Sequence, residues 1–256
     1  MNPLSDEKSV LNLPIREISP DPSVIWASQG AQSSLLDHYR LLRTRLRQHP
    51  FLHKTLVVTS ACPSDGKSTV CINLAGVMAQ KKLRVAIVDC DLRKSRLGSL
   101  LGVKASLGLT SLLDGAELEE VMFTPSVQPN LSVLLAGPQV ANPVDVLDSE
   151  IFGRTLAKLR NEFDYVILDA PPVLHLADFP VLERQCDATA FVVRPGFTNR
   201  SSMYEAMRSL SEDKFTGIVV NQNVDWWMWR SANYYSYNGY YGNNYQTAKS
   251  ENAPDS

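Results

Sequence analysis

The residues "ACPSDGKST", at positions 61–69, have the types and the spacing needed to hold phosphate groups. They follow the pattern GxxxxGK[ST], with Ala61 at the position of the first glycine. Gly66 lets the backbone approach a phosphate closely, Lys67 supplies positive charge for the β- and γ-oxygens, and Ser68 supplies a hydroxyl for Mg²⁺. Such a loop needs inward-facing backbone N–H groups and a helix N-terminus beyond it. The motif therefore predicts binding of a nucleotide through its phosphates.

Four more residues are assigned to the same region, two of them with alternatives left open. Thr69 is expected near the α-phosphate, and Asp65 precedes the glycine of the loop. Asn221 ends the last apolar run, where its amide either binds an adenine edge or forms a turn. Arg93 either pairs with a phosphate or a carboxylate, or faces solvent.

Three aspartates stand where apolar runs end. Asp89 and Asp91 end "RVAIVDCD", and their spacing of two places both side chains on one side of an extended chain. Asp169 ends "YVILD" and fits the Walker B position, where it holds Mg²⁺ directly or through water. Ligands bind at the carboxyl ends of parallel strands. Because carboxylates alone would repel phosphates, a divalent cation is predicted between them.

Six short β-branched runs alternate with segments of helical periodicity. The runs are apolar without alternation and helices lie between most of them, which predicts a mostly parallel sheet covered by helices on both faces. The predicted strands are 55–60, 84–89, 131–136, 165–170, 188–193 and 216–221. The predicted helices are 67–82, 144–162, 177–186 and 200–212. Residues 92–130 are expected to mix short helices with loops.

Composition divides the chain into three parts. Residues 1–31 carry four prolines among polar residues and are expected to form a flexible arm. Residues 32–224 are expected to form one α/β domain, which begins with a helix over 33–49 that has a leucine-rich face and a stripe of arginines. Residues 225–256 are expected to form a flexible tail rich in Tyr, Asn and Gly.

Composition also excludes several function classes. Lys and Arg total 25 against 27 Asp and Glu, so there is no basic surface for nucleic acid. The four cysteines form no CxxC pair and no metal-ligand spacing, which indicates a reducing compartment. The N-terminus lacks a signal-peptide pattern, and no stretch approaches about 18 apolar residues. A cytoplasmic protein is expected, with membrane contact that is peripheral or made through a partner.

The segment "NYYSYNGYYGNNY", residues 233–245, holds six of the nine tyrosines of the chain. A disordered tail, an adhesive low-complexity segment and an edge strand on a partner are three explanations, and the fourth is that the tyrosines are substrates. Nearby "WWMWR", residues 226–230, is explained by packing against the sheet edge, by an adaptor surface or by a shallow membrane contact. The candidate phosphoacceptors are Tyr234, Tyr235, Tyr237, Tyr240, Tyr241 and Tyr245.

Taken together, these features resemble the bacterial tyrosine kinase (BY-kinase) family, the cytoplasmic kinases of capsule and exopolysaccharide assembly. The resemblance rests on "ACPSDGKS" as Walker A, "VAIVDCDLR" as the extra Walker A′, "VILDAPP" as Walker B and the tyrosine-rich tail. It extends from about residue 33 to the C-terminus. It implies a P-loop NTPase fold of the SIMIBI, MinD-like class and an ATP-dependent protein-tyrosine autokinase.

The resemblance implies ATP and Mg²⁺ as cofactors and gives roles to individual residues. Lys67 would hold the ATP phosphates, and Asp89 would accept the proton of an incoming tyrosine hydroxyl. That hydroxyl has a pKa near ~10 when unperturbed, so its deprotonation is expected with or after nucleophilic approach. The implied metal ligands are Ser68, Asp91 and Asp169. The implied catalytic set is Lys67, Asp89, Asp91, Arg93 and Asp169.

The family also has an ExxRxxR helix that packs neighbouring subunits into a ring. Here "DHYRLLR" supplies Asp37, Arg40 and Arg43, with Asp at the Glu position. The resemblance implies a homo-oligomeric ring, with an octamer as one candidate size, in which the tail is phosphorylated in trans. It further implies a cognate tyrosine phosphatase and a membrane-anchored polysaccharide co-polymerase adaptor that recruits the kinase to the inner face of the cell membrane.

Two other functions stay open. An ATPase of the MinD/ParA group shares the fold, but usually carries a second lysine early in the phosphate loop, near Cys62 or Pro63 here, and this chain lacks it. A non-catalytic scaffold would bind the nucleotide only to gate an assembly machine. The intact lysine and the three aspartates argue against such a loss of chemistry.

Overall fold

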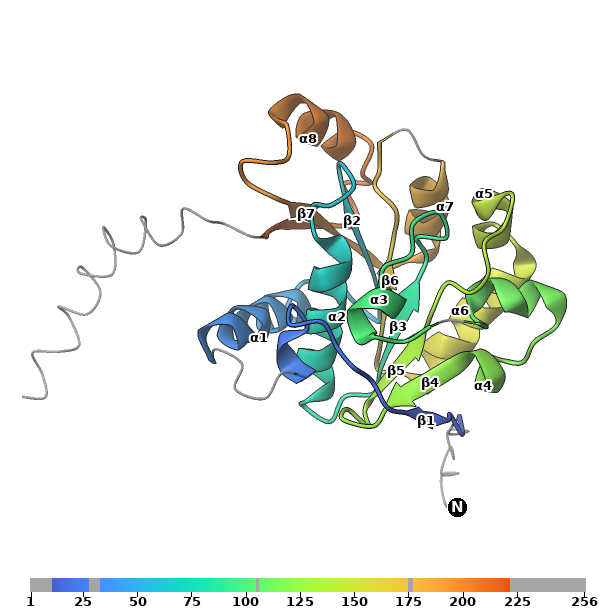
Figure 1. Ribbon diagram of the computed structural model, residues 1–256. Coiled ribbons are helices and arrows are strands. Elements are labelled where there is room, and N and C mark those ends of the chain that lie inside the picture. The colour runs from blue at the N-terminus through green and yellow to red at the C-terminus, as the bar shows by residue number, and fades with distance from the viewer. Residues whose placement is uncertain (1–10, 28–32, 105, 175–176, 222–256) are drawn as a thin grey trace, which may run out of the picture. The chain divides into compact units, whose positions relative to one another are not determined.

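The computed structural model describes residues 11–27, 33–104, 106–174 and 177–221. Its strands are β1 (Ile15–Arg16), β2 (Thr55–Ser60), β3 (Val85–Asp89), β4 (Met122–Pro125), β5 (Leu131–Leu134), β6 (Tyr165–Asp169), β7 (Ala188–Val193) and β8 (Phe215–Val220). These described strands form one sheet in the order β1-β4-β5-β3-β6-β2-β7-β8 (Figure 1). Every neighbouring pair is parallel except β4 and β5.

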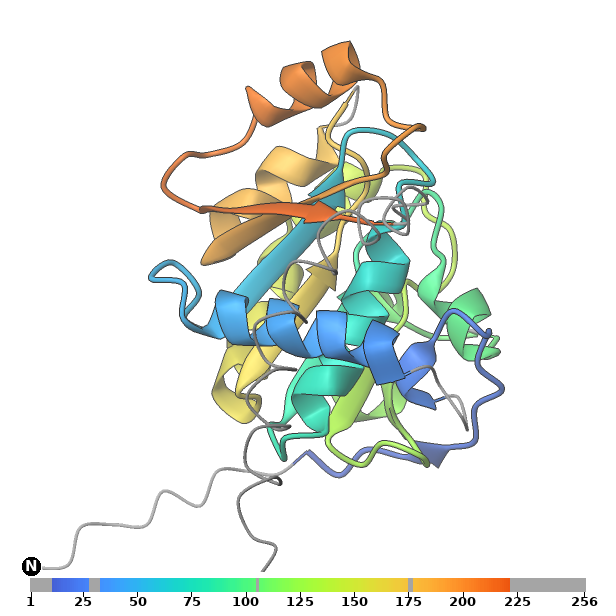
Figure 2. The same cartoon turned by 90° about the vertical axis from the view of Figure 1, so that its left-hand side faces the viewer.

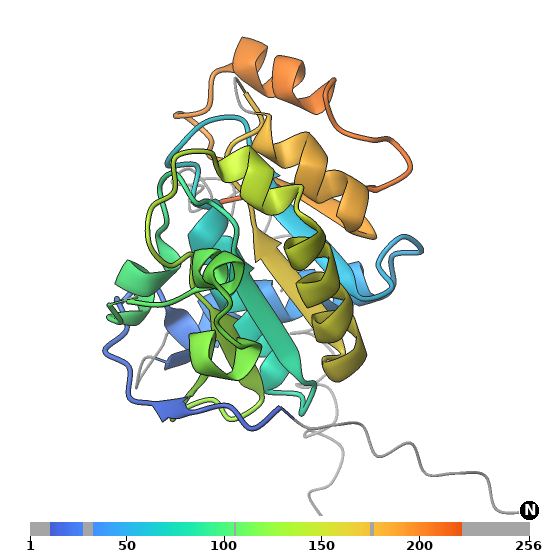
Figure 3. The ribbon, with the colours of Figure 1, turned by 90° about the vertical axis from the view of Figure 1, so that its right-hand side faces the viewer.

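Helices cover both faces of the sheet, as the sequence predicts. The helices are α1 (Ser33–Arg47), α2 (Lys67–Ala79), α3 (Leu97–Leu101), α4 (Leu118–Val121), α5 (Pro143–Leu147), α6 (Glu150–Glu162), α7 (Asp178–Gln185) and α8 (Arg200–Met207), with 3-10 turns η1 (Ile25–Ala27) and η2 (Leu109–Asp114). One core cluster joins α1, α2 and α3 to the sheet (Figure 2). The other joins α5, α6 and α7 to the opposite face (Figure 3).

The central strands bring the predicted site residues together. All residues of β2 and β3 are buried, because each strand is apolar on both faces and a helix layer covers each face. In the register of β3 against β6, Asp89 lies opposite Asp169. Strand β2, which leads into the phosphate loop, lies on the other side of β6. The carboxyl ends of three adjacent strands therefore meet where the sequence places the phosphate loop and the aspartates.

All six predicted strands are present, and the predicted helices differ mainly in their ends. The segment 144–162 is two helices, α5 and α6, and not one. Ser149 causes the division, because its side chain accepts a hydrogen bond from the backbone N–H of Phe152 at 3.1 Å and so starts a new helix. Within 92–130 the predicted short helices are present, but the strand β4, antiparallel to β5, was not predicted.

The prediction of a flexible arm over residues 1–31 is wrong for residues 11–27. Ile15 and Arg16 form β1, which extends the sheet beside β4. Val24 is fully buried, and the indole N–H of Trp26 donates to the carbonyl of Ile72 on α2 at 2.9 Å. A Cβ added to Gly76 would lie 2.3 Å from the Trp26 ring, so α2 leaves space for this indole. The Trp26 contacts span about fifty residues and the pairing of β1 with β4 spans more than one hundred, so neither leaves a local sequence signal.

Residues Gln222–Ser256 are a separate unit from Met1–Asn221. The candidate phosphoacceptor tyrosines and the tryptophan-rich segment 226–230 lie in it, outside the described residues. Within the described part of the chain, none of the helices combines the length and the apolar character that a membrane crossing requires.

Candidate active site

The phosphate loop, residues 61–69, joins β2 to the N-terminus of α2. Gly66 is the N-cap of α2 and has a φ of 92°, a left-handed conformation that favours glycine. A Cβ at this position would also lie 2.0 Å from Asn221 Nδ2. Lys67 is therefore the first residue of α2, where backbone N–H groups without helical partners favour a bound anion. Ala61 is 1% exposed, so its methyl group fills the space beside the loop.

Lys67 forms an ion pair with Asp91 inside the site. Its Nζ lies 3.0 Å from Asp91 Oδ2, and both side chains are buried. Burial alone would lower the pKa of Lys67, but the negative charges of Asp169 and Asp91 outweigh it and raise that pKa. The ammonium group is therefore held in its charged form, and its binding of phosphate oxygens stays a prediction.

Asp169 is fully buried at the end of β6 and has an unsatisfied oxygen. Its Oδ1 accepts a weak hydrogen bond from Cys71 Sγ at 3.7 Å. Its Oδ2 has no hydrogen-bond partner among the described residues. Burial raises the pKa of Asp169 to about 6, although the charge of Lys67 opposes the rise. Such a carboxylate is costly unless a ligand completes it.

The donor set fits a Mg²⁺ ion. The free Oδ2 of Asp169 is the kind of oxygen that a hard cation binds, and the buried Ser68 and Asp91 supply two more oxygen donors. The interaction of Ser68 with the Asp169 carboxylate, which lowers the pKa of Asp169, places the two side chains together. That Ser68, Asp91 and Asp169 bind the metal stays a prediction.

Asp89 takes different partners from Asp91, although the two are only two residues apart. Its Oδ2 accepts hydrogen bonds from Ser95 Oγ at 2.6 Å and from the N–H of Leu97 at 3.3 Å. Its Oδ1 accepts from the N–H of Asp91 at 3.2 Å. Burial, followed by the charge of Asp169, raises the pKa of Asp89 to about 7. The value suits a proton acceptor, and the hydrogen bonds from residues 91–97 cover this carboxylate. That Asp89 accepts a tyrosine proton stays a prediction.

Arg93 pairs with a carboxylate and not with the phosphate loop. Its Nε and Nη2 donate to Asp178 at 2.7 Å and 3.1 Å, a bidentate pair. Asp178 is the first residue of α7 and is 1% exposed, while the Arg93 side chain is 42% exposed. The pair connects the loop after β3 to the helix that follows β6. The hydrogen bond to Asp178 raises the pKa of Arg93 further.

The opposite side of the phosphate loop is held by hydrogen bonds from the segment after β7 and from the end of β8. The fully buried Asp65 accepts from Thr198 Oγ1 at 2.6 Å and from the N–H of Cys62 at 3.1 Å. The amide of Asn221 donates to the carbonyl of Asp65 at 3.0 Å. One N–H of the Asn221 amide is thus used to shape the loop. That the rest of this amide binds an adenine edge stays a prediction.

Comparison with known proteins decides the family. A family model described as an AAA domain matches residues 54–186. The tyrosine-protein kinase YwqD of Bacillus subtilis is 32% identical over 214 residues, which cover 80% of this chain and 86% of that protein. The kinase domain of the Escherichia coli tyrosine kinase ETK is 28% identical, with a TM-score of 0.68 over 73% of this chain and 74% of that one. The chain belongs to the bacterial tyrosine-protein kinases.

The MinD cell division ATPase of Pyrococcus furiosus also matches, with a TM-score of 0.55 at 22% identity over 67% of this chain and 73% of that one. This likeness shows the fold alone. The tyrosine-kinase family membership and the MinD-like P-loop fold that the sequence indicates are therefore both confirmed. The fold is that of nucleotide-binding proteins.

In this kinase the residues of the predicted ring helix divide between two roles. Arg40 Nη1 pairs with Asp37 Oδ1 at 2.7 Å on the exposed side of α1. Arg43 instead is buried, and its Nη1 donates to the carbonyl of Val77 on α2 at 3.0 Å. Its assignment to a subunit contact does not agree with this position, because its guanidinium is already used between α1 and α2. Asp37 and Arg40 remain predicted contacts.

The sequence did not predict three residues that lie outside the motifs and form hydrogen bonds with residues of the site. Thr198 and Asp178 contact Asp65 and Arg93 across 133 and 85 positions of the chain. Ser95 stands close to Asp89 in sequence, and its hydroxyl directly after "DLRK" is the one signal that was available. The two distant partners follow from tertiary structure alone.

Proposed function

We propose that the chain transfers the γ-phosphoryl group of Mg²⁺-ATP to tyrosine hydroxyls, first to those of its own C-terminal cluster and in trans between copies of the chain. The observation that carries the proposal is the arrangement at the ends of β3 and β6. There the buried Lys67–Asp91 pair and the free oxygen of Asp169 lie beside the phosphate loop. Family membership supplies the acceptor class, tyrosine.

The residues of the site would divide the work as follows. Lys67 would leave Asp91 and bind the phosphate oxygens, since its raised pKa keeps it charged. Ser68, Asp91 and Asp169 would hold the Mg²⁺ ion, which neutralises charge that develops on the transferred group. The N-terminus of α2 would orient the phosphates. Positioning and charge neutralisation carry most of such a reaction.

Asp89 would accept the proton of the attacking hydroxyl. Its pKa of about 7 lies close to the pH of a cytoplasm, which suits a group that must both take and release a proton. Its three hydrogen bonds to residues 91–97 mean that this loop must open first. Asp65 and Asn221 would act on the loop backbone, and the remaining polar atoms of the Asn221 amide would bind the adenine edge.

Phosphorylation of the tail would explain why six of the nine tyrosines lie in one short segment. From Val224 to Tyr234 is ten residues, which reach roughly 33–36 Å when extended. In the proposed ring, that length would let the tail reach the nucleotide site of a neighbouring copy. Each phosphate adds about −1.5 to −2 charge, so six add on the order of ten negative charges per subunit and loosen the ring by repulsion.

The same proposal places the kinase in polysaccharide assembly. A membrane-anchored co-polymerase adaptor would recruit it to the cytoplasmic face of the cell membrane and activate it, and a tyrosine phosphatase would reverse the modification. Cycles of ring assembly and release would then control polymerisation and export of a capsule or exopolysaccharide. The relevant partner is a protein, with no role for nucleic acid.

The test is intact-protein mass spectrometry after incubation with Mg²⁺-ATP. Three full-length chains are compared: the natural chain, Lys67→Ala, and a chain with the six tail tyrosines changed to Phe. A ladder of added phosphates on the natural chain, absent from Lys67→Ala and strongly reduced in the tail variant, is the expected result. An unchanged ladder in Lys67→Ala would refute the proposal.

A second candidate, an ATPase of the MinD/ParA group, is favoured by the MinD-like fold. Formation of ADP without any protein-bound phosphate would support it. Neither ADP nor phosphate, also after addition of the cytoplasmic part of a cognate adaptor, would indicate a nucleotide-gated scaffold without chemistry.

A further inference from the structure

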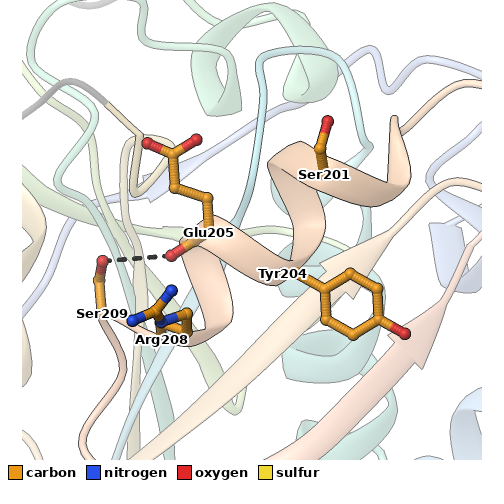
Figure 4. Close-up of a pocket in the computed structure, with 5 residues that line it drawn as sticks. All are labelled: Ser201, Tyr204, Glu205, Arg208 and Ser209. Atoms are coloured by element: carbon orange, nitrogen blue, oxygen red, sulfur yellow. Dashed lines mark hydrogen bonds between the residues drawn. The ribbon is translucent and has the colours of Figure 1, made fainter.

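The helix α8 carries an exposed tyrosine that belongs to no motif. Tyr204 is 62% exposed, and Figure 4 shows its ring extending away from the helix axis. The side chains around it line a shallow hollow of about 580 Å³, formed by Ser201, Tyr204, Glu205, Arg208 and Ser209. All five come from α8 and the residues that follow it directly.

The other tyrosines that the structure describes are engaged in the fold. Tyr39 is half-buried between α1 and α2, and burial raises its pKa to about 12. The hydroxyl of Tyr165 accepts a hydrogen bond from Arg47 Nε at 3.4 Å. Of the three described tyrosines, Tyr204 alone is exposed.

The surroundings of Tyr204 suit a phosphate. Arg200 and Arg208 stand four residues before and four residues after it, a spacing from which either side chain can turn toward a phosphate on Tyr204. Glu205 is one acidic neighbour against these two. A phosphotyrosine dianion is therefore favoured electrostatically here, since guanidinium groups form strong charge-assisted hydrogen bonds with phosphate.

The helix is also weakly attached. Among the eight residues of α8 only Ala206 is fully buried, and Met203 and Met207 pack against the core while partly buried. Local opening of an element with so few buried contacts costs less than global unfolding. Tyr204 can therefore be presented to an enzyme in an extended conformation without loss of the core.

We propose that Tyr204 is a phosphoacceptor site in the folded domain, modified by a second copy of this chain. The inference rests on the proposed function. The Oη of Tyr204 attacks the γ-phosphorus of ATP bound to the other copy, the bond from that phosphorus to the β,γ-bridging oxygen breaks, and ADP leaves with its electron pair. The phenolic proton passes to a carboxylate of the site or to water. The products are phosphotyrosine, ADP and a proton.

The segment before Tyr204 contacts the phosphate loop, so phosphorylation of Tyr204 can affect the nucleotide site. Thr198 binds Asp65 of the phosphate loop at 2.6 Å, and Arg194 reaches the carbonyl of Ser64 at 3.5 Å. Phosphorylation that shifts α8 would act on the same segment. Tyr204 would thus report the activity of one copy to the phosphate loop of the next.

The experiment uses two full-length chains. The donor is the natural chain labelled with ¹⁵N, and the acceptor is unlabelled, carries Lys67→Ala and has its six tail tyrosines changed to Phe. Trypsin releases Tyr204 in the peptide SSMYEAMR, residues 201–208, while Tyr39 and Tyr165 lie in peptides 17–40 and 161–184. Mass spectrometry then separates the two chains and the three sites.

Phosphate on peptide 201–208 of the acceptor is the expected result, with peptides 17–40 and 161–184 unmodified. The matched acceptor with Tyr204→Phe should lose at least nine tenths of that signal. An equal signal in Tyr204→Phe would assign the phosphate to a serine of the peptide and overturn the inference.

The donor separates failure of the inference from failure of the proposed function. If its tail gains phosphate while peptide 201–208 stays unmodified in both chains, the inference is wrong and the kinase function stands. If the donor tail gains none, both fail. The donor's own peptide 201–208 also reports on Tyr204 in an unaltered domain, so misfolding of the acceptor cannot hide the result.

Discussion

The phosphate loop lies between two groups of residues that differ in how their polar atoms are paired. On the side of β3 and β6 stand Asp89, Asp91 and Asp169, buried together with a single ammonium group. On the side of β7 and β8 stand Thr198 and Asn221. We call the first the carboxylate side and the second the hydrogen-bonding side.

The two sides differ in how far their polar groups are satisfied. On the carboxylate side the pKa values of Asp89 and Asp169 are raised, and one Asp169 oxygen has no partner among the described residues. On the hydrogen-bonding side both oxygens and the carbonyl of Asp65 accept hydrogen bonds. Unsatisfied buried charge indicates a place where a ligand binds. Complete hydrogen bonding indicates a place where backbone shape is fixed.

The largest expected effect is on the carboxylate side. Lys67→Ala should lower tyrosine phosphorylation by at least about 10²-fold, because it removes a preorganised positive charge from the transferred group. Lys81→Ala, at an exposed position just beyond the same helix, is the matched control and should keep normal activity. The rate of ³²P incorporation from labelled ATP measures both. Retained activity in Lys67→Ala would remove the basis for assigning chemistry to this side.

The second effect is a pH dependence of stability in the absence of nucleotide and Mg²⁺. A carboxyl group whose folded pKa is raised stabilises the fold below its unfolded value of 3.8, and this stabilisation is lost as pH rises through the folded value of about 6 for Asp169. Asp169→Asn should therefore be more stable than the natural chain at pH 8, by about 1–3 kcal/mol. The difference should vanish near pH 4.

Urea unfolding with EDTA at pH 4, 6 and 8 measures this difference. Asp148→Asn, which alters an exposed surface ion pair with Arg184, is the control and should show no such trend. A stabilisation by Asp169→Asn that grew as the pH fell would contradict the charge balance inferred for the carboxylate side.

The third effect is on the hydrogen-bonding side. Thr198→Val removes the hydroxyl that donates to Asp65 at 2.6 Å and leaves a buried carboxylate with a backbone donor only. We expect a loss of about 1–3 kcal/mol of unfolding free energy and weaker ATP binding. Thr198→Ser keeps the hydroxyl and should restore both. Titration with a fluorescent ATP analogue checks the affinity, and equal behaviour of Val and Ser would show that the hydroxyl does not shape the loop.

The smallest effect concerns Arg93, which lies beside the carboxylate side but pairs outward with Asp178. Arg93→Lys cannot keep the bidentate geometry, so we expect a loss of about 0.5–1 kcal/mol of stability and nearly normal phosphorylation. Thermal unfolding and ³²P incorporation test this. A loss of activity as large as that of Lys67→Ala would return Arg93 to the catalytic set.

Local sequence was sufficient to predict site residues that follow one another in the chain. Gly66, Lys67 and Ser68 follow one another at the start of α2, and a strand of β-branched residues precedes them. Asp89 and Asp169 end their strands as predicted, because an apolar run must stop where a polar site begins. The packing of Val24 and Trp26, the strand β4 and the buried position of Arg43 were not predicted, because each depends on a partner distant in the sequence.

The sequence by itself determined six of the eight described strands, the phosphate loop and the family, since hydrophobic periodicity and contiguous motifs are local properties. Only the tertiary structure decided which hydrogen-bond or ion-pair partner each polar side chain has. Asp89 and Asp91 are neighbours in sequence, yet one binds Ser95 and the other binds Lys67. Asn221 binds the backbone of Asp65 across 156 positions. Hydrogen bonding and desolvation depend on which atoms meet in three dimensions, and that meeting is set by the packing of the whole sheet.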